Sequence, residues 1–506
     1  MSQEPGPLAI VSALFSRLNV EGIPYCHWKS NEHLGAALAG ATDLDVLVGP
    51  EPAALGRILT DIGFKRVVAV PDRAYPGIED FLALDPRSGK LAHLHLHRQL
   101  VLGERKLKGY RLPWEDRMLS TRRLDEKHAV YLADPHLELL LLMIRASLKL
   151  RARDLIRSAL RKPYFRGGMF REFRWLVERV DQGQLVDTAR PLVGERAAHA
   201  LAALMFGIPS ARQLHAFRRA VEPSLSRYRL HGPAEARRER WGREWRTRWR
   251  AAAQRGLGVP IPWQRTIPRG GLIVAFLGCD GSGKSTQTRE IAGWLSWKLD
   301  VLPLYFGSGD GPASLLRQPL RLLNAVRQAP RTQRKRESGS PARRQPRQER
   351  TGPRQALREL RQVWWALALA HEKRRRIARA DRARQRGMIV ICDRYPQSQI
   401  VGSNDSPRLS RWLGHRSAML RALATWEEQA YRAAIVSPPD LVVKLHVTPE
   451  VAALRKPDMP RDALPRRVEV IKKLTFPPPT RVVDIDAGQP MSQVLQQIKQ
   501  AIWQHV

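Results

Sequence analysis

The segment GCDGSGKST, residues 278–286, has the residue types needed to hold a chain of phosphates. It satisfies the pattern G-x-x-x-x-G-K-[ST] and lies between the apolar run GLIVAF and a helical pattern. The glycines let backbone N–H groups turn toward phosphates, Lys284 neutralises phosphate charge, and the Ser285 hydroxyl can ligate Mg²⁺. We therefore expect ATP and Mg²⁺ to bind at Gly278, Gly281, Ser282, Gly283, Lys284, Ser285 and Thr286.

A second apolar run, GMIVICDRYP at 387–396, ends in Asp393 and Arg394. Open parallel sheets bind their ligands at the carboxyl ends of the strands. A carboxylate that faces a phosphate-binding loop can organise Mg²⁺ and water, so we expect Asp393 to be a metal ligand. Lys284, Asp393 and Arg394 are candidate catalytic residues, and the alternative for Asp393 is a helix cap or a structural ion pair.

Arginines follow a third apolar run, PPDLVVKLHVTPEVAALRK at 438–456, and precede a last strand-like run, RVVDIDAG. Arginines that close over a transferring phosphoryl group stabilise its charge, and these could form such a lid. The candidates are Arg455, Arg461, Arg466 and Arg467, and we expect Arg455 and Arg461 to be catalytic. The alternative is a solvated basic helix.

Residues 270–506 resemble the thymidylate kinase family of P-loop nucleoside monophosphate kinases. The segments that carry the resemblance are, in order, GCDGSGKST, CDRYP, PPDLVVKLHVTPEVAALR and VVDIDAGQPMSQVLQQI. The resemblance implies that Asp280 and Arg394 contact the acceptor. It also implies that the lid provides the catalytic arginine, since Gly281 stands where other members have Arg. Two acceptor-side segments depart from the family pattern: YFGSGDGP at 305–312 and LALAHEKRRR at 367–376.

The N-terminal part contains a polar turn, Lys29-Ser30, followed by Asp43 and Asp45 in the strand-like run DLDVLV. Two carboxylates two residues apart on a strand share one face, which suits Mg²⁺ and a nucleotide triphosphate. This arrangement resembles the nucleotidyltransferase superfamily, in which a Gly-Ser turn precedes an Asp-x-Asp strand. Lys29 stands where the first small residue would be, and no third carboxylate is evident.

A later strand-like run, LAHLHLH, places His93, His95 and His97 on one face. Three interpretations stay open at this stage. The imidazoles could bind a metal ion, they could mark a nucleotidyltransferase that has lost its third aspartate, or they could be a polar sheet face.

The chain of 506 residues is too long for one core, and its patterns predict an α/β protein with two main domains. We expect a mixed α/β nucleotidyltransferase-like domain at 1–130 with a helical extension at 131–232. A Trp-bearing basic helix and linker should follow at 233–269. The last domain, 270–506, should be a parallel P-loop sheet with helices on both faces, and it contains a basic segment, 331–355, expected to be disordered.

The helix expected at 235–250 places Trp241, Trp245 and Trp249 four residues apart among arginines. We expect these tryptophans to dock onto a flanking domain, with a membrane-surface role as the alternative.

Lys and Arg total 86 against 48 Asp and Glu, a formal charge of +38, which favours anionic partners. Nucleic acid is a possible partner but is not favoured, because the basic segment has no aromatic residue to stack on bases. Peripheral membrane contact and a homodimer are left open.

The three cysteines, Cys26, Cys279 and Cys392, have no metal-ligand spacing, and a reducing cytoplasm fits them. No run is long and apolar enough for a membrane span.

Together these patterns predict an ATP-dependent phosphotransferase whose acceptor is a nucleotide or a small phosphorylated or hydroxyl-bearing molecule. Thymidylate is the best single named acceptor. Two alternatives stay open: a P-loop kinase that acts on a sugar or another non-nucleotide, and a regulatory or nucleic-acid-binding NTPase.

Overall fold

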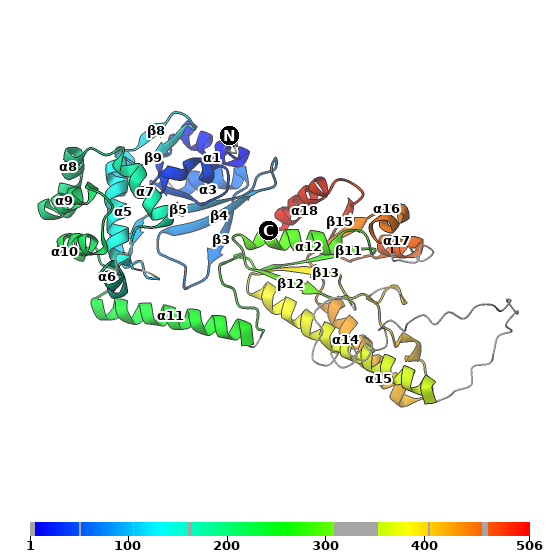
Figure 1. Ribbon diagram of the computed structural model, residues 1–506. Helices are drawn as coiled ribbons and strands as arrows, with labels where there is room; N and C mark the ends of the chain where they lie inside the picture. Colours follow the sequence, from blue (N-terminus) through cyan, green and yellow to red (C-terminus); the bar gives the residue numbers. More distant parts are fainter. Residues whose placement is uncertain are drawn as a thin grey trace, which may run out of the picture. The chain divides into compact units, whose positions relative to one another are not determined.

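The computed structural model describes residues 6–49, 52–104, 106–159, 164–256, 258–307, 353–402, 405–457 and 464–506 (Figure 1). The chain divides into two compact units, with the boundary between Arg269 and Gly270. Each unit has its own sheet and its own hydrophobic clusters. The predicted fold class, α/β with a mixed first domain and a parallel P-loop sheet in the second, is confirmed.

The first unit is built on an eight-stranded mixed sheet in the order β10-β3-β4-β5-β2-β1-β9-β8. The β1–β9 and β2–β5 pairs are parallel and the other pairs are antiparallel. The strands are β1 (Tyr25–His27), β2 (Leu44–Val48), β3 (Lys65–Ala69), β4 (Ile78–Leu84), β5 (Leu91–His97), β8 (Arg123–Asp125), β9 (Val130–Leu132) and β10 (Arg265–Thr266). A separate hairpin is formed by β6 (Leu100–Leu102) and β7 (Tyr110–Leu112).

Two details of this sheet differ from the sequence-based expectations. Asp43 precedes β2, which begins at Leu44. Residues 265–266, expected to be part of a linker, pair with β3 as an edge strand. A pairing of only two residues leaves no periodic pattern in the sequence, which explains why β10 was missed.

Successive side chains of a strand point to opposite faces of the sheet, so the central strands have one apolar face and one polar face. Leu44, Val46 and Val48 of β2 belong to one hydrophobic cluster with Leu94 and Leu96 of β5. Residues of α1 (Ala9–Val20) and α3 (Pro52–Ile62) complete that cluster, so these helices cover this face. The polar residues at the alternate positions of β2 and β5 therefore point to the opposite face.

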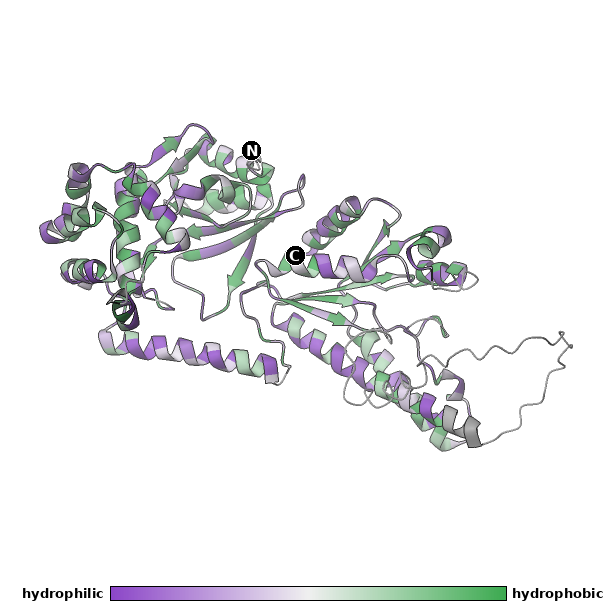
Figure 2. Ribbon diagram, viewed as in Figure 1, coloured by the Kyte–Doolittle hydropathy of each residue, from purple (hydrophilic) through white to green (hydrophobic). Residues whose placement is uncertain are grey.

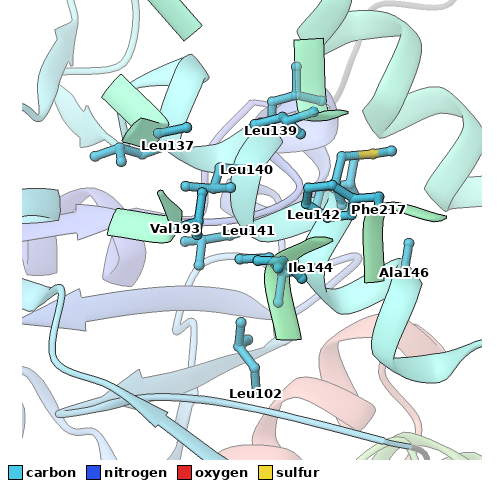
Figure 3. Packing of buried hydrophobic residues seen from close by; sticks show 14 of the residues in the cluster. Leu102, Leu137, Leu139, Leu140, Leu141, Leu142, Ile144, Ala146, Val193 and Phe217 are labelled. Carbon is cyan, nitrogen blue, oxygen red and sulfur yellow. The ribbon is translucent and has the colours of Figure 1, made fainter. Parts of the chain in front are cut away.

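The helical part of the first unit surrounds α5 (Pro135–Lys149), whose side chains are buried from Leu137 to Ile144. Figure 3 shows these leucines pointing in several directions from α5, with Val193 and Phe217 of neighbouring helices among them. Asp134 caps the helix by accepting a hydrogen bond from the His136 backbone N–H.

The surrounding helices are α6 (Ala152–Ala159), α7 (Gly167–Val177), α8 (Gln182–Val193), α9 (Glu195–Ala202) and α10 (Ala211–Ser226). Shorter elements of the unit are η1 (Asn31–His33), α2 (Leu34–Leu38), α4 (Glu115–Ser120) and η2 (Ala203–Met205).

The predicted basic helix is α11 (Pro233–Gly256), and Figure 2 shows that most of its length is hydrophilic. Arginines make its contacts with Asp72 and Tyr75 of the first unit. Arg246 Nε lies 3.1 Å and Arg250 Nη1 3.2 Å from the two carboxylate oxygens of Asp72, and the Arg243 guanidinium lies 5.3 Å from the centre of the Tyr75 ring. The three tryptophans, Trp241, Trp245 and Trp249, are 68%, 67% and 55% exposed. Their predicted docking is therefore wrong for the first unit, because arginines hold the helix instead.

The second unit contains a five-stranded sheet in the order β12-β13-β11-β14-β15, with every pair parallel. The strands are β11 (Leu272–Gly278), β12 (Val301–Tyr305), β13 (Ile389–Asp393), β14 (Leu441–His446) and β15 (Arg481–Asp486). The helices are α12 (Lys284–Ser296), α14 (Pro353–Gln385), η3 (Ser410–Trp412), α15 (Ala418–Val436), α16 (Pro449–Arg455), α17 (Leu464–Lys473) and α18 (Met491–His505). Figure 1 shows α12 and α18 on one side of the sheet and α14 and α15 on the other.

Residues 331–352 of the expected disordered segment lie outside the described residues, and its last three residues begin α14. The three cysteines are free and buried. Among the described helices, none has the length and apolarity required to cross a bilayer.

Candidate functional site

The predicted phosphate-binding loop connects β11 to α12 at the centre of the parallel sheet. Gly281 and Gly283 have φ angles of +87° and +84°, which favour glycine. A Cβ at Gly281 would lie 2.7 Å from the Ala452 carbonyl oxygen of α16. A Cβ at Gly278 would lie 2.4 Å from Ser282 Oγ. The loop therefore requires its glycines both for backbone angle and for space, and Gly281 cannot become Arg without a shift of α16.

Lys284 is the first residue of α12 and is only 6% exposed. Its Nζ donates a hydrogen bond of 2.6 Å to the Cys279 carbonyl oxygen, across the loop. Burial, with a smaller contribution from Arg394, lowers the pKa of Lys284 to about 8. The ammonium group thus lies inside the loop, where it would contact a bound phosphate. Thr286 is exposed in the first turn of the same helix.

Ser285 and Asp393 come together although they are 108 residues apart in the sequence. Ser285 Oγ donates a hydrogen bond of 2.7 Å to Asp393 Oδ2. The second carboxylate oxygen, Oδ1, is buried and has no hydrogen-bond partner among the described residues, and the same holds for Ser282 Oγ. A buried carboxylate oxygen without a donor is costly unless a cation or water satisfies it. Ser285 and Asp393 therefore fit Mg²⁺, which takes oxygen ligands.

Arg394, directly after β13, has a φ of +71°, which is uncommon for a residue other than glycine. Its guanidinium donates from Nη2 to Asp280 Oδ1 at 2.5 Å and from Nη1 to Asp405 Oδ2 at 3.3 Å. Burial opposes the charge, but Asp405 and Asp280 outweigh it and raise the pKa of Arg394. Backbone strain of this kind is often found at functional sites.

Asp280 lies between two arginines. It accepts from Arg394 and, through Oδ2, from Arg467 Nη1 of α17 at 2.7 Å. Burial of Asp280 is opposed by Arg394 and Lys284, which leave the pKa of its carboxyl group below the usual value. This chain of ion pairs joins the phosphate loop, the end of β13 and α17.

A cavity lies beside these ion pairs. Three arginines contribute to its wall, Arg394, Arg466 and Arg467, together with the carboxylate of Asp405. The remaining wall is largely apolar or aromatic, with Tyr395, Ile400, Val470, Ile471 and Leu474 among its residues. Such a lining suits a ligand with an anionic group and an apolar or aromatic part.

The arginines expected to form a lid lie in different environments. Arg466 and Arg467 line the cavity, whereas Arg455 donates to the Ala487 carbonyl oxygen at 2.9 Å, directly after β15. Arg461 lies outside the described residues. The role of each arginine in catalysis stays a prediction.

Sequence reasoning did not find the residues that support the cavity wall near Asp405. Lys373, in the divergent segment at 367–376, is 1% exposed, and its Nζ donates to the Asp405 carbonyl oxygen at 3.2 Å and to Tyr431 Oη at 3.0 Å. Glu427 is also 1% exposed and accepts from the backbone N–H groups of Arg408 and Leu409. A buried polar position in a helix is the signal that could have indicated them, but their partners depend on the tertiary fold.

The N-terminal residues expected to bind Mg²⁺ have other partners in the described structure. Asp45 Oδ1 lies 2.8 Å from Lys29 Nζ, and Asp43 Oδ1 lies 2.7 Å from His93 Nδ1. His97 Nε2 lies 3.3 Å from Asp45 Oδ1, and burial lowers the pKa of His97 to about 3, so that ring is neutral near pH 7. Ser30, in the expected polar turn, has a φ of +58°.

The fold and the geometry around residues 278–286 define the second unit as a P-loop α/β domain. No family model matches the chain. The chain is 29% identical over 241 residues to the uncharacterized ATP-binding protein YghR of Escherichia coli K12, covering 46% of this chain and 86% of YghR. YghR of E. coli O6:H1 gives the same values. The uncharacterized ATP-binding protein YghS of E. coli K12 is 26% identical over 231 residues, which are 46% of this chain and 92% of YghS. The chain is thus similar, over less than half of its length, to most of two proteins whose names describe ATP binding.

Proposed function

We propose that the second unit binds Mg·ATP and transfers the γ-phosphoryl group to a small acceptor held in the cavity beside Asp280. The observation that carries this proposal is the contact of Ser285 with Asp393, directly beside the Arg394–Asp280–Arg467 ion pairs. It brings a donor-phosphate site and an anion-binding wall together at the carboxyl ends of neighbouring strands. The names of the relatives support ATP as the nucleotide.

The donor side would be formed by the loop itself. Backbone N–H groups of residues 281–286 and the Lys284 ammonium would hold the phosphates. Ser285 and Asp393 would hold Mg²⁺, whose charge helps to neutralise the charge that develops on the phosphates. Little covalent help is required from the protein, because phosphoryl transfer depends mainly on position and electrostatics.

The acceptor side combines three arginines with an apolar or aromatic wall. Arg394 and Arg467 would neutralise an acceptor phosphate and keep it close to the γ-phosphoryl group. Asp280 would fix both guanidinium groups in place through its two oxygens. In the transfer, the bond between the γ-phosphorus and the bridging oxygen breaks, the bond to an ionised oxygen of the acceptor phosphate forms, and ADP leaves.

A nucleoside monophosphate fits this lining best, because it combines a phosphate with a flat ring. The resemblance of residues 270–506 to thymidylate kinases makes dTMP the best named candidate. The two acceptor-side segments that depart from the thymidylate kinase pattern, residues 305–312 and 367–376, support an acceptor that differs from thymidylate. Sugar phosphates and other non-nucleotide acceptors are therefore the second candidate class.

An acceptor screen tests the proposal. ADP release by the purified chain would be measured with Mg²⁺ and ATP, with nucleoside monophosphates, sugar phosphates and free sugars each added separately. We expect a phosphate-bearing acceptor to raise ADP release above the rate without acceptor, and Asp393→Asn to remove that increase. Asp484→Asn is a matched control, since Asp484 is 60% exposed on β15 and pairs with His446. ADP release that no acceptor increases would favour an NTPase instead.

A further inference from the structure

A second group of ionisable side chains lies in the first unit, on the sheet face opposite α1 and α3. In the strand register, Asp45 of β2 is opposite His95 of β5, and His95 is opposite Asp80 of β4. Directly opposite residues on paired strands have side chains close enough to interact. His93 lies two residues away on the same face, so both imidazoles are close to Asp80.

The ring nitrogens of His93 and His95 have the same pattern of partners. Their Nε2 atoms both lie 2.9 Å from Asp80 Oδ1. Their Nδ1 atoms face other carboxylates, Asp43 at 2.7 Å and Asp45 at 3.2 Å. A neutral imidazole has only one N–H group to donate. If the ring is neutral and Nδ1–H donates to Asp43 or Asp45, the lone pair of Nε2 faces Asp80, which is unfavourable unless the ring takes a second proton or one cation is bound by both atoms.

This pattern is the usual one for histidines that bind metal ions. A metal-binding histidine commonly donates its other N–H to a carboxylate, which fixes the tautomer and the ring orientation. Asp43 and Asp45 would have that role here. The three inner donor atoms all lie within 4.8 Å of one another, and His93 and Asp80 are 0% and 6% exposed.

We propose that Asp80, His93 and His95 bind a divalent transition-metal ion. Two imidazole nitrogens and one carboxylate oxygen suit Zn²⁺, Mn²⁺ or Fe²⁺, whereas Mg²⁺ prefers oxygen ligands alone. The site differs from the expected Mg²⁺ site at Asp43 and Asp45, because these two carboxylates orient the histidines instead of contacting the ion.

Arg265 of β10 competes for the same position. Its Nε lies 2.9 Å from Asp80 Oδ1, and its Nη2 lies 3.3 Å from His95 Nε2. A metal ion would displace this guanidinium, since both cations require the same carboxylate oxygen and the same nitrogen lone pair. Asp80, His95 and Arg265 line a cavity of about 370 Å³, which gives an ion a route to the donor atoms of Asp80 and His95 and gives the arginine room to move.

Zinc binding by the full-length chain tests this site. The chain would be treated with a chelator, freed of it and titrated with Zn²⁺ in a calorimeter without nucleotide. We expect one tight site per chain. Asp80→Asn and His93→Gln should weaken binding by at least about tenfold, since each removes or alters a direct ligand. His97→Gln is the matched control: His97 lies on the same strand and face, and it should leave binding nearly unchanged.

Arg265→Ala separates the proposal from a purely ionic cluster. Removal of the competing cation should tighten Zn²⁺ binding, whereas in an ionic cluster of imidazolium groups it would create no zinc site. Circular dichroism would confirm that each variant folds. X-ray absorption at the zinc edge of the unmodified chain requires no variant, and it should show two imidazole ligands.

Three results would overturn the assignment. The first is no stoichiometric Zn²⁺ binding by the unmodified chain, and the second is equal binding by Asp80→Asn. The third is a loss of binding in His97→Gln but not in Asp80→Asn, which would place the ion at Asp45, His95 and His97 instead.

Discussion

Asp280→Asn is the substitution that separates acceptor binding from ATP binding most clearly. The change keeps the size of the side chain but removes the charge that two arginines share. Asp280 accepts from Arg394 at 2.5 Å and from Arg467 at 2.7 Å, and its side chain is only 14% exposed. We expect both guanidinium groups to be held less firmly on the cavity wall.

The size of the effect follows from these two contacts. A hydrogen bond to a charged group contributes about 1.5–3 kcal/mol, so two such bonds contribute roughly 3–6 kcal/mol. The asparagine can still accept one weaker bond, and Arg394 keeps Asp405 as a partner, so about 3 kcal/mol is the expected loss. At about 1.4 kcal/mol for each tenfold change, kcat/KM for the acceptor should fall by roughly 100-fold or more.

The assay combines steady-state kinetics with calorimetry. The acceptor concentration would be varied at saturating Mg·ATP to obtain kcat/KM, and the Kd for ATP would be measured separately. We expect the Kd for ATP to stay within about threefold, because Asp280 accepts its hydrogen bonds from the acceptor-side arginines, whereas Lys284 donates to the Cys279 carbonyl oxygen. Unchanged kcat/KM for every accepted substrate would refute the reasoning, and an equal loss in ATP affinity would show that Asp280 supports the donor site instead.

Three further outcomes are expected. Lys284→Ala should reduce ATP turnover by at least about 100-fold with little change in the melting temperature, since the hydrogen bond that the described structure shows for the lysine is to a loop carbonyl; turnover within a factor of two of the unmodified chain would contradict its role. Burial, with Glu172 adding to it, raises the pKa of Glu138 to about 8, above its ordinary value of 4.5. This carboxyl's contribution to stability is therefore complete below pH 4.5 and is lost as the pH rises to 8, by up to about 1.4 kcal/mol per pH unit. Urea unfolding at pH 5.5 and 7.5 should show a smaller decline for Glu138→Gln, and identical declines would contradict the linkage. Finally, changing Trp241, Trp245 and Trp249 to Ser should alter the free energy of unfolding by no more than about 0.5 kcal/mol each, because the side chains are exposed. A cooperative loss of several kcal/mol would show that they are buried against another surface.

The parts of the second unit that could be predicted are those encoded locally. A glycine-rich loop between an apolar strand and a helix defines its own geometry, so residues 278–286 could be recognised without a fold. Asp393 and Arg394 could be placed near the loop because they end an apolar run, and parallel strands end at one edge. The contact of Ser285 with Asp393 follows from that rule.

The parts that could not be predicted depend on strand register and on pairing between distant segments. Asp80 becomes the centre of the histidine cluster only because β4 pairs with β5 so that Asp80 is opposite His95. Arg265 reaches the same point from a two-residue strand 185 positions later in the chain. Arg394, Asp280 and Arg467 likewise come from three separate segments, and no periodic pattern connects them.

The fate of the γ-phosphoryl group tests the central proposal most directly. Phosphorus-31 NMR would follow Mg·ATP and the best acceptor from the screen, with the unmodified chain and with Asp393→Asn. We expect the resonance of a new phosphoryl group on the acceptor to grow in proportion to ADP, and Asp393→Asn to suppress both. Inorganic phosphate as the only product, at a rate that the acceptor does not change, would contradict phosphoryl transfer by this unit.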